Sequence, residues 1–512
     1  MNRRDFVFSW GRKMFFGFSW PLTSLLFIIY FQSYIFPRTS LEWFFYLTSH
    51  FAQSGLITCV LYFLLFCPVI YLLPYYYACR FWGLFLILAA NILIFLDATT
   101  FAQYGHHLNS FIGELVFQNI NLASFIFFIL AGSLGLGLFF WFRGDRLWRS
   151  MQTHFSNPVK NWYLVIIGLC VVLSHFTFNQ KLSDLFPLKD PFVSSQKQTN
   201  FDEEKNFNYP AQEIICPGKN SSNFLFLVVD SLSPSEISPE FPMLNHLKQY
   251  HASNFTNHVA LGLSTEDSLF SFFYGLAPKY SPTSKLPVFF NELLKRNYQL
   301  NIFHQLPFYK KESAALDGQV LDRFKEWSTQ YKESQSLQPF FNYVFFEKSR
   351  FPLAEIDKSI ELFVSDLQNK KLLNDTVIVV TSLTGNSTSL SLAKFQVPLF
   401  ITWSERKSIS ISHLTTHYDV MPTIMKKVWA CKNPPENYSY GKLLSDVPAK
   451  DWLIGGSKED LAVFDWGKKN IILIKDRDYE TSNFEGQKIS VDNVRKDIVL
   501  DALKISKKFY KR

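Results

Sequence analysis

One carboxylate and two hydroxyl residues stand where a site that cleaves or transfers an ester would need them. Asp230 directly follows the apolar run NFLFLVV, and Ser264 and Thr265 open the segment STEDSLFSFF, which has the pattern of a helix. A hydroxyl at the N-terminus of a helix faces the positive end of the helix dipole, where a phosphate or sulfate docks. Such a hydroxyl can act as a nucleophile. These three residues are therefore the candidate catalytic residues.

Ser264 also has a purely structural interpretation. The run Ser264-Thr265-Glu266-Asp267 fits a capping box. In that motif the serine side chain binds a free amide of the first helical turn. Both interpretations stay open on the residues alone.

A second predicted strand ends at the expected site, but no acidic, imidazole or thiol side chain follows it. The stretch DTVIVVTSLTGNSTSL, residues 375–390, predicts a buried strand over Val377–Val380. In open α/β sheets, reactive side chains gather beyond the carboxyl ends of the strands. Here Ser382, Leu383, Thr384 and Gly385 follow, which include no carboxylate, imidazole or thiol. The strand therefore brings no metal ligand to the site.

Strand-like and helix-like runs alternate over residues 223–512. Continuous apolar runs, rather than runs that are apolar at every second residue, indicate strands covered on both faces. The pattern predicts an α/β domain with a mainly parallel sheet sandwiched by helices. The strand-like runs are NFLFLVVDSL, FFNYVFF, TVIVV and VPLFITW, the helix-like runs are DKSIELFVSDLQNKKLL and YDVMPTIMKKVW, and PVFFNELLKRNYQLNIFHQ is a helix followed by a strand.

The chain has two unlike halves. Residues 1–180 are strongly apolar and aromatic, whereas residues 181–512 have the composition of a soluble domain. We expect a transmembrane domain with five helices at 1–180, an interfacial linker at 181–222 and a soluble α/β domain at 223–512. Of the net charge of +8, the first 180 residues carry +5, from ten basic and five acidic residues. This charge reflects membrane topology and does not indicate nucleic acid binding.

Five apolar runs are long enough to cross a bilayer, which takes about 17 to 25 residues of helix. Most basic residues of this half would share a side with the N-terminus, and only Arg38 lies opposite. Since positive residues stay in the cytoplasm, we expect a multi-pass inner-membrane protein with a cytoplasmic N-terminus and a periplasmic C-terminal domain. The five runs are Trp20–Phe36, Leu56–Tyr77, Phe81–Phe101, Ser124–Phe142 and Trp162–Phe178.

Three polar residues interrupt the apolar half near the end of the third run. Asp97 is an ionisable residue in an apolar helix, which makes it a functional candidate, although at this depth it can also simply reach interfacial water. His106 and His107 are too close in sequence to define a metal site by themselves. Further along the chain, Cys216 and Cys431 could form a disulfide in an oxidising compartment, but no spacing decides this.

These motifs together resemble the alkaline phosphatase and sulfatase superfamily. The resemblance rests on Asp230 after the first strand, a hydroxyl residue opening the next helix, and the runs LLNDTVIVVTS, FQVPLFITW and THYDVMPTIM. The branch resembled is that of membrane-anchored phosphotransferases, which make lipoteichoic acid or add phosphoethanolamine to lipid A. The five apolar runs, LD and HLN around the third run, and FFYGLAP narrow the resemblance to the YejM (PbgA) family of Gram-negative inner-membrane proteins.

The resemblance implies lost metal chemistry. Active members read Thr-Ser-Asp-His-Gly where this chain has Thr381-Ser382-Leu383-Thr384-Gly385, so both metal ligands are replaced. Active relatives also carry a histidine shortly before the VPL strand, which residues 391–395 lack. A catalytic Zn²⁺ needs about three protein ligands, so we expect no cofactor and a vestigial site at Asp230, Ser264 and Thr265. The other candidate ligands are scattered without ligand spacing: His246, His251, His258, His304, His413 and His417.

The resemblance also implies a ligand and a partner. Members of the YejM family bind the lipid A part of lipopolysaccharide at the outer face of the inner membrane. They use it to set proteolysis of the enzyme committed to lipid A synthesis, through an adaptor (LapB) of the FtsH protease. The family's lipid-binding segment corresponds here to LFPLKDPFVSSQKQ, Leu185–Gln198.

This linker suits a membrane interface. Its aromatic and aliphatic side chains can rest on acyl chains, its prolines stiffen the backbone, and its lysines can meet phosphates. The family carries paired arginines near Ser195 and Gln196, and lysine lacks their bidentate fork. Without the resemblance, an ordinary proline-containing linker is the simpler interpretation. The candidate lipid-binding residues are Phe186, Pro187, Leu188, Lys189, Pro191, Phe192, Ser194 and Lys197.

Three functions follow. The first is a non-catalytic sensor of lipopolysaccharide that regulates its synthesis and outer-membrane homeostasis. The second is a phosphatase, sulfatase or phosphoethanolamine-type transferase, with Asp230 binding Zn²⁺, Mg²⁺ or Mn²⁺ and Ser264 as nucleophile. The third is a structural envelope protein that tethers or traffics glycerophospholipids. The missing Asp-His pair favours the first.

Overall fold

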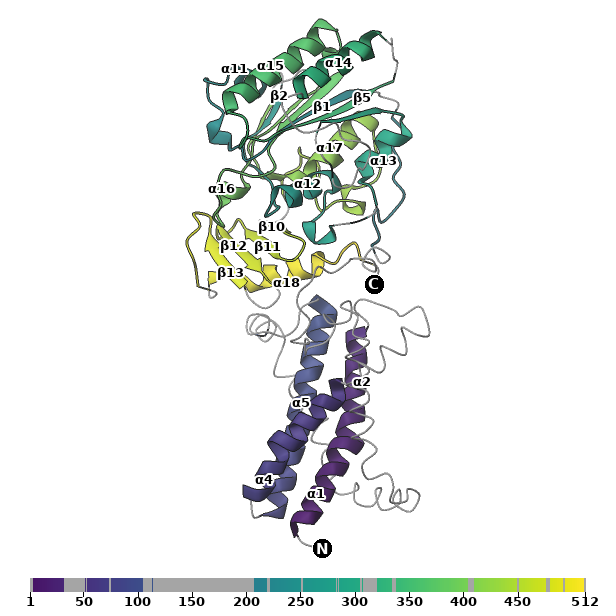
Figure 1. Cartoon of the computed structure of the whole chain (residues 1–512), viewed down its shortest axis with the longest axis vertical. Helices are drawn as coiled ribbons and strands as arrows, with labels where there is room; N and C mark the ends of the chain where they lie inside the picture. Colours follow the sequence, from purple (N-terminus) through teal and green to yellow (C-terminus); the bar gives the residue numbers. More distant parts are fainter. Residues whose placement is uncertain are drawn as a thin grey trace. The chain divides into compact units, whose positions relative to one another are not determined.

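The computed structural model divides the chain into two compact units, residues 1–202 with 512, and residues 203–511. Each unit is described by itself below (Figure 1). The structure describes residues 3–31, 51, 53–72, 75–104, 113, 207–218, 222–249, 252–281, 283, 285–303, 306, 320–333, 338–403, 409–448, 451–475, 479–490 and 493–510.

The first unit consists, in its described part, of apolar helices. Two of them, Gln53–Leu72 and Tyr76–Phe101, are long and apolar enough to cross a membrane, and they match the second and third predicted spans. The first predicted span is helical over Trp20–Phe31, and the last two lie outside the described residues. The number of five therefore stays a prediction. The elements are α1 (Arg3–Met14), η1 (Phe15–Ser19), α2 (Trp20–Phe31), η2 (Leu61–Phe66), α4 (Cys67–Leu72) and α5 (Tyr76–Tyr104).

Buried polar side chains join these helices. Thr23 donates a hydrogen bond to Asn91 at 3.1 Å, which ties α2 to α5. Ser24 Oγ lies 2.7 Å from Ser54 Oγ, which ties α2 to the helix Gln53–Leu72. Such hydrogen bonds help apolar helices to associate, since burial of apolar surface alone does not favour it in lipid. Asp97 is half-buried on α5.

The second unit is built on a seven-stranded sheet in the order β4-β5-β1-β6-β7-β2-β8. Neighbouring strands run parallel except at β7, which is antiparallel to both neighbours, so the sheet is mixed. The strands are β4 (Gln299–Phe303), β5 (Phe340–Phe346), β1 (Asn223–Val229), β6 (Thr376–Thr381), β7 (Leu399–Thr402), β2 (Ala252–Phe255) and β8 (Ile409–Ile411).

Helices cover both faces of this sheet, as the continuous apolar strands predict (Figure 1). Successive residues of a strand point to opposite faces. Phe224, Phe226 and Val228 of β1 pack with one group of helices, and Leu225 and Leu227 pack with the other. The first group is α12 (Thr265–Tyr274), α13 (Val288–Lys295) and α17 (His417–Trp429); the second is α11 (Pro242–Gln249), α14 (Val320–Glu333) and α15 (Leu353–Asn369).

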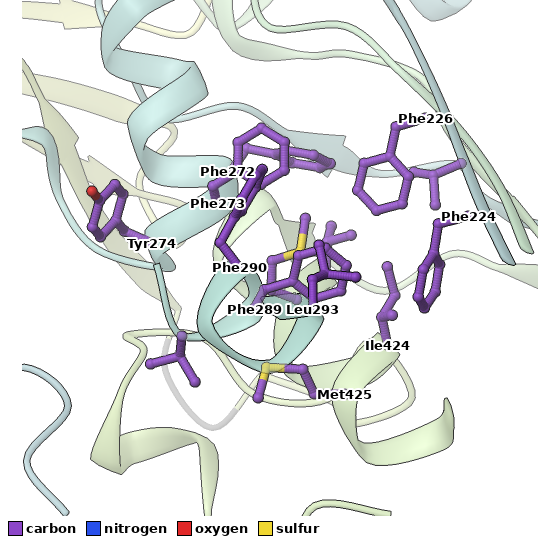
Figure 2. Close-up of a cluster of buried hydrophobic side chains, with 14 of the residues drawn as sticks. Phe224, Phe226, Phe272, Phe273, Tyr274, Phe289, Phe290, Leu293, Ile424 and Met425 are labelled. Atoms are coloured by element: carbon purple, nitrogen blue, oxygen red, sulfur yellow. The ribbon is translucent and has the colours of Figure 1, made fainter. Parts of the chain in front are cut away.

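The first face holds a core of aromatic rings. Figure 2 shows Phe226 of β1 among the rings of α12 and α13. Its ring centroid lies 6.0 Å from that of Phe272, 5.9 Å from that of Phe289 and 5.1 Å from that of Phe341. Offset and edge-to-face pairs of this kind add about 0.5 to 1.5 kcal/mol each beyond their buried area. This packing fixes β1, and with it the residue that follows, Asp230.

A second, antiparallel sheet, which the sequence patterns did not predict, follows in the chain. Its strands lie in the order β10 (Trp452–Gly456), β11 (Leu461–Asp465), β12 (Asn470–Ile474) and β13 (Tyr479–Asn483), and α18 (Lys496–Ile505) contacts β10 and β11. The amide of Gly456 donates to the carbonyl of Leu261 at 2.8 Å. A Cβ on Gly455 would lie 2.2 Å from that carbonyl oxygen, so only glycine fits. The contact holds the segment that enters α12.

A disulfide joins Cys216 to Cys431, the pair that the sequence left open. It connects the segment before β1 to the residues just after α17. Next to it, the amide of Gly218 donates to the carbonyl of Trp429 at 2.8 Å. The start of the second unit is thereby fastened to the helix that covers the aromatic core.

Candidate functional site

Three of the residues singled out above meet at one edge of the large sheet. Thr265 Oγ1 donates to Asp230 Oδ1 at 3.1 Å, and Thr384 Oγ1 donates to the same oxygen at 3.3 Å. All three side chains are half-buried. We call Asp230, Thr265 and Thr384 the hydroxyl cluster. Its carboxylate is bound by neutral hydroxyls.

Strand pairing places the members of this cluster. β1 and β6 are parallel neighbours, with Val228 opposite Thr381, so their carboxyl ends meet at the same edge. Ser231 turns the chain after β1 with a positive φ of 54°, a left-handed conformation that few residues other than glycine adopt. Its hydroxyl lies 3.2 Å from that of Thr384. The amide of Leu232 donates to Ser382 Oγ at 3.0 Å, which locks the two loops together.

Ser264 has the structural role. It is the N-cap of α12 and accepts a hydrogen bond from the amide of Asp267 at 3.2 Å, while its hydroxyl donates to the carboxylate of Asp267 at 2.6 Å. Burial raises the pKa of Asp267, and the hydrogen bonds from Ser264 oppose that rise. Of the two hydroxyl candidates, Thr265 is therefore the one that contacts Asp230.

Leu383 is a core residue. Its side chain has an exposed fraction of 0% and belongs to the cluster that contains the aromatic core. The next residue, Thr384, turns back to Asp230. The first of the two positions at which active relatives carry a metal ligand is thus filled by apolar packing, and the second by a neutral hydrogen-bond donor.

The residues present do not fit a catalytic metal. A metal needs several anionic or imidazole ligands around one point, and here one carboxylate faces two hydroxyls. Within the described part of the chain, no three His, Cys, Asp or Glu side chains lie close enough to hold a metal ion.

Two histidines that appear unrelated in sequence lie together behind the cluster. His258 and His417 are fully buried, with ring centroids 5.2 Å apart. His417 Nε2 lies 3.4 Å from Thr381 Oγ1, and His258 Nδ1 lies 3.0 Å from Thr415 Oγ1. Burial lowers the pKa of His417 to about 3 and lowers that of His258 as well. The scattered spacing hid this pair, which the pairing of β3 (His258–Val259) with β9 (Thr415–Thr416) creates.

A further charged residue, Lys348, lies at this edge of the sheet and was not among the predicted site residues. Lys348, just after β5, donates to the carbonyl of Ser231 at 3.2 Å and forms an ion pair with Glu236. It supports the turn after Asp230 from the neighbouring strand. A lysine two residues after the FFNYVFF run was the available signal, since β5 and β1 are parallel and end at the same edge.

The candidate lipid-binding segment, Leu185–Gln198, lies outside the described residues, as do His106 and His107. Their assignments stay predictions.

Comparison with known proteins supports the two-part organisation. Residues 2–184 match the family described as a domain of unknown function, DUF3413, and residues 352–428 match the sulfatase family. The inner membrane protein YejM of Salmonella typhimurium is 21% identical over 524 residues, which cover 88% of each chain. An uncharacterized protein of Haemophilus influenzae is 25% identical over 288 residues, 49% of this chain and 48% of that protein.

Solved structures similar to this chain include a protein of the alkaline phosphatase superfamily from Vibrio parahaemolyticus. It is 13% identical, with a TM-score of 0.43, and the match covers 59% of this chain and 92% of that one. The observed mixed sheet between two layers of helices, together with the sulfatase match at its second half, gives the unit a sulfatase-like α/β fold. The chain thus combines a DUF3413 region with a sulfatase-like unit and is similar to the inner membrane protein YejM along most of its length.

Proposed function

We propose that this chain is a non-catalytic regulator in the bacterial inner membrane that binds the lipid A part of lipopolysaccharide. Through this ligand it controls lipopolysaccharide synthesis and outer-membrane homeostasis. The observation that carries the non-catalytic part is the hydroxyl cluster, in which Thr265 and Thr384 bind the carboxylate of Asp230. Leu383 supports the same view, because it fills the core where a metal ligand would stand in active relatives.

Membrane location has separate support. The two apolar helices Gln53–Leu72 and Tyr76–Phe101 are long enough to span a bilayer, and the relative YejM is named an inner membrane protein. The basic residues of the first 180 positions favour a cytoplasmic N-terminus. A disulfide between Cys216 and Cys431 suits an oxidising compartment. The proposed topology is multi-pass, with the sulfatase-like unit in the periplasm.

The proposed ligand contacts are in the linker Leu185–Gln198. Phe186, Leu188 and Phe192 supply apolar surface for acyl chains, and Lys189 and Lys197 supply charge for phosphates. Phospholipids compete for the same surface. The proposed protein partner is a LapB-like adaptor of the FtsH protease, which would contact the apolar helices.

Binding of lipid A to the purified full chain in nanodiscs tests this proposal. We expect saturable binding of lipid A, weakened about tenfold or more when Lys189 and Lys197 are both replaced by glutamine, since each lysine near an anionic surface contributes about 1 kcal/mol. Lys358→Gln, an exposed lysine on α15, is the matched control and leaves binding unchanged. Equal binding by all three proteins contradicts the linker assignment, and no binding of lipid A contradicts the sensor.

A metal-dependent phosphotransferase is the second candidate. One observation favours it: Thr265 places a hydroxyl at the N-terminus of α12 and within 3.1 Å of a carboxylate, a place where an anionic ester could dock. That function would need metal ligands beyond Asp230, and it would use Thr265, rather than Ser264, as the nucleophile. Removing these two groups separates the two functions, since only the phosphotransferase needs them.

A further inference from the structure

A cavity of about 340 Å³ lies beside the hydroxyl cluster but does not include it. It is lined by the turn after Asp230, at Ser233–Ser235, by Lys248 of α11, and by residues at the end of β2 and the start of β7. Small-molecule sites in proteins have volumes of about 300 to 1,000 Å³. The cavity is therefore large enough for a compact ligand.

Three polar side chains line this cavity without a protein partner. In the described part of the chain, the amine of Lys248 and the carboxamides of Asn254 and Gln396 form no hydrogen bond or ion pair. All three are partly exposed. Polar groups that converge on a cavity and stay unpaired are available for a ligand, because no protein contact must be broken first.

The charge of the lining selects an anion. Lys248 is the charged member, and no aspartate or glutamate lines the cavity. A lysine amine acts as a point charge that suits a phosphate. A single such cation favours a ligand with one anionic group, whereas a polyanion would leave charge uncompensated.

The other residues that line the cavity suit a small ligand that carries hydroxyl groups. A carboxamide both donates and accepts hydrogen bonds, as Asn254 and Gln396 can, and this matches ligand hydroxyls, which do both. The hydroxyls of Ser233 and Ser235, 2.9 Å apart, add further donors and acceptors. Phe255 and Phe400 give the cavity an apolar wall.

We infer that this cavity binds a small phosphorylated polyol, with the phosphate at Lys248 and the hydroxyl groups at Asn254 and Gln396. This chemistry belongs both to soluble sugar phosphates and to the phosphoglycerol headgroup of a lipid. The site is made of other residues than the proposed lipid A linker, so the inference stands without the proposed function. It assigns the sheet edge beside the hydroxyl cluster a binding role that needs no catalytic metal.

Calorimetric titration of the full chain in detergent tests the site with four probes: glucose 1-phosphate, glycerol 3-phosphate, inorganic phosphate and glucose. We expect at least one phosphorylated polyol to bind more tightly than inorganic phosphate and glucose. Lys248→Gln weakens that binding about tenfold to a hundredfold, as loss of a charge-assisted hydrogen bond does. Gln396→Ala weakens it about threefold to tenfold, and the control Lys358→Gln does not change it.

The outcomes separate the two ligand sources. Tighter binding of glucose 1-phosphate supports a sugar phosphate, and tighter binding of glycerol 3-phosphate supports a lipid headgroup. If neither phosphorylated polyol binds, if inorganic phosphate binds as tightly as both, or if Lys248→Gln binds like the parent, the inference is wrong. Should Lys248→Gln fail to fold, Asn254→Ala takes its place, with the same expected loss as Gln396→Ala.

Discussion

Thr265 Oγ1 lies 3.1 Å from Asp230 Oδ1, so the residue that opens α12 hydrogen bonds to the residue that closes β1. A carboxylate that accepts hydrogen bonds from two threonine hydroxyls has protein partners already. Thr384, the second donor, stands where active relatives of the superfamily carry a metal ligand. In this chain the edge of the sheet presents one carboxylate that accepts hydrogen bonds from two hydroxyls.

Removal of Asp230 and Thr265 should leave function intact. We expect Asp230→Ala combined with Thr265→Ala to restore a normal envelope to a strain that lacks the gene, because neither side chain has a catalytic task in a sensor. Amounts of membrane-inserted protein, compared by immunoblot, control for folding. Loss of rescue at normal protein levels would instead support the phosphotransferase.

Leu383 should matter for stability and Thr384 should matter little. Leu383 is fully buried in the core, and a Leu→Ala substitution in such a place costs about 2 to 5 kcal/mol. Thr384→Ala removes a half-buried hydroxyl that contacts Asp230 and Ser231, and each of these hydrogen bonds contributes about 0.5 to 1.5 kcal/mol. Hydrogen exchange of β6 peptides in the full chain measures both changes. A larger loss in Thr384→Ala than in Leu383→Ala would contradict the core assignment.

The disulfide should stabilise the second unit. Cys216 and Cys431 are 215 residues apart in sequence, and a cross-link that closes a long loop typically contributes about 2 to 4 kcal/mol. We expect the double variant Cys216→Ala, Cys431→Ala to lose that amount of unfolding free energy. Mass analysis after alkylation, with and without reductant, checks the bond itself. A label on Cys216 or Cys431 without reduction would show that the pair is open.

Acid should destabilise the second unit through His417. Its pKa is lowered from 6.5 to about 3. Below about pH 6.5 this histidine is therefore protonated in the unfolded chain but remains neutral in the folded chain. The free energy of unfolding decreases as the pH falls. At pH 5 this amounts to about 2 kcal/mol for this one histidine, at 1.36 kcal/mol per pKa unit. His258, whose pKa is also lowered, acts in the same direction.

Asp419 opposes this effect in part, because burial raises its pKa to about 6, so that the folded state gains a proton, and stability, as the pH falls below about 6. The diagnostic comparison is therefore between variants. His417→Gln should show a smaller loss of β6 protection between pH 7 and pH 5 than the parent, whereas His246→Gln, at an exposed position, should match the parent. Equal pH dependence in all three proteins would contradict the role of His417.

Local sequence patterns predicted β1, β4, β5, β6 and β7 of the large sheet but not β2 or β8. Burial on both faces leaves a continuous apolar run in β1, β5, β6 and β7, which is the signal that the sequence carries. The direction of β7 was not readable, since a strand covered on both faces has the same pattern whether parallel or antiparallel. Which of the two hydroxyls contacts Asp230, that of Ser264 or that of Thr265, depends on the exact residue at which α12 begins. A sequence pattern does not give that position to within one residue. Successive helical residues are rotated by about 100° about the helix axis, so one of the two side chains caps the helix while the next one reaches Asp230.

Long-range contacts set the rest. His258 and His417 lie together because β3 pairs with β9. No sequence pattern near either histidine predicts that pairing. Gly455 and Gly456 belong to a sheet whose link to the site is a backbone contact with Leu261, nearly two hundred residues earlier. The linker residues Leu185–Gln198 lie outside the described part, so their lipid contacts are accessible only to experiment.

Native mass spectrometry of the full chain, purified in detergent from a Gram-negative host, tests the central claim most directly. Bound mass is recorded before and after treatment with a chelator. A non-catalytic lipid sensor predicts an adduct of the mass of lipopolysaccharide that survives the chelator. A stoichiometric divalent metal that the chelator removes, without such an adduct, would contradict the account and return Asp230 and Thr265 to catalysis.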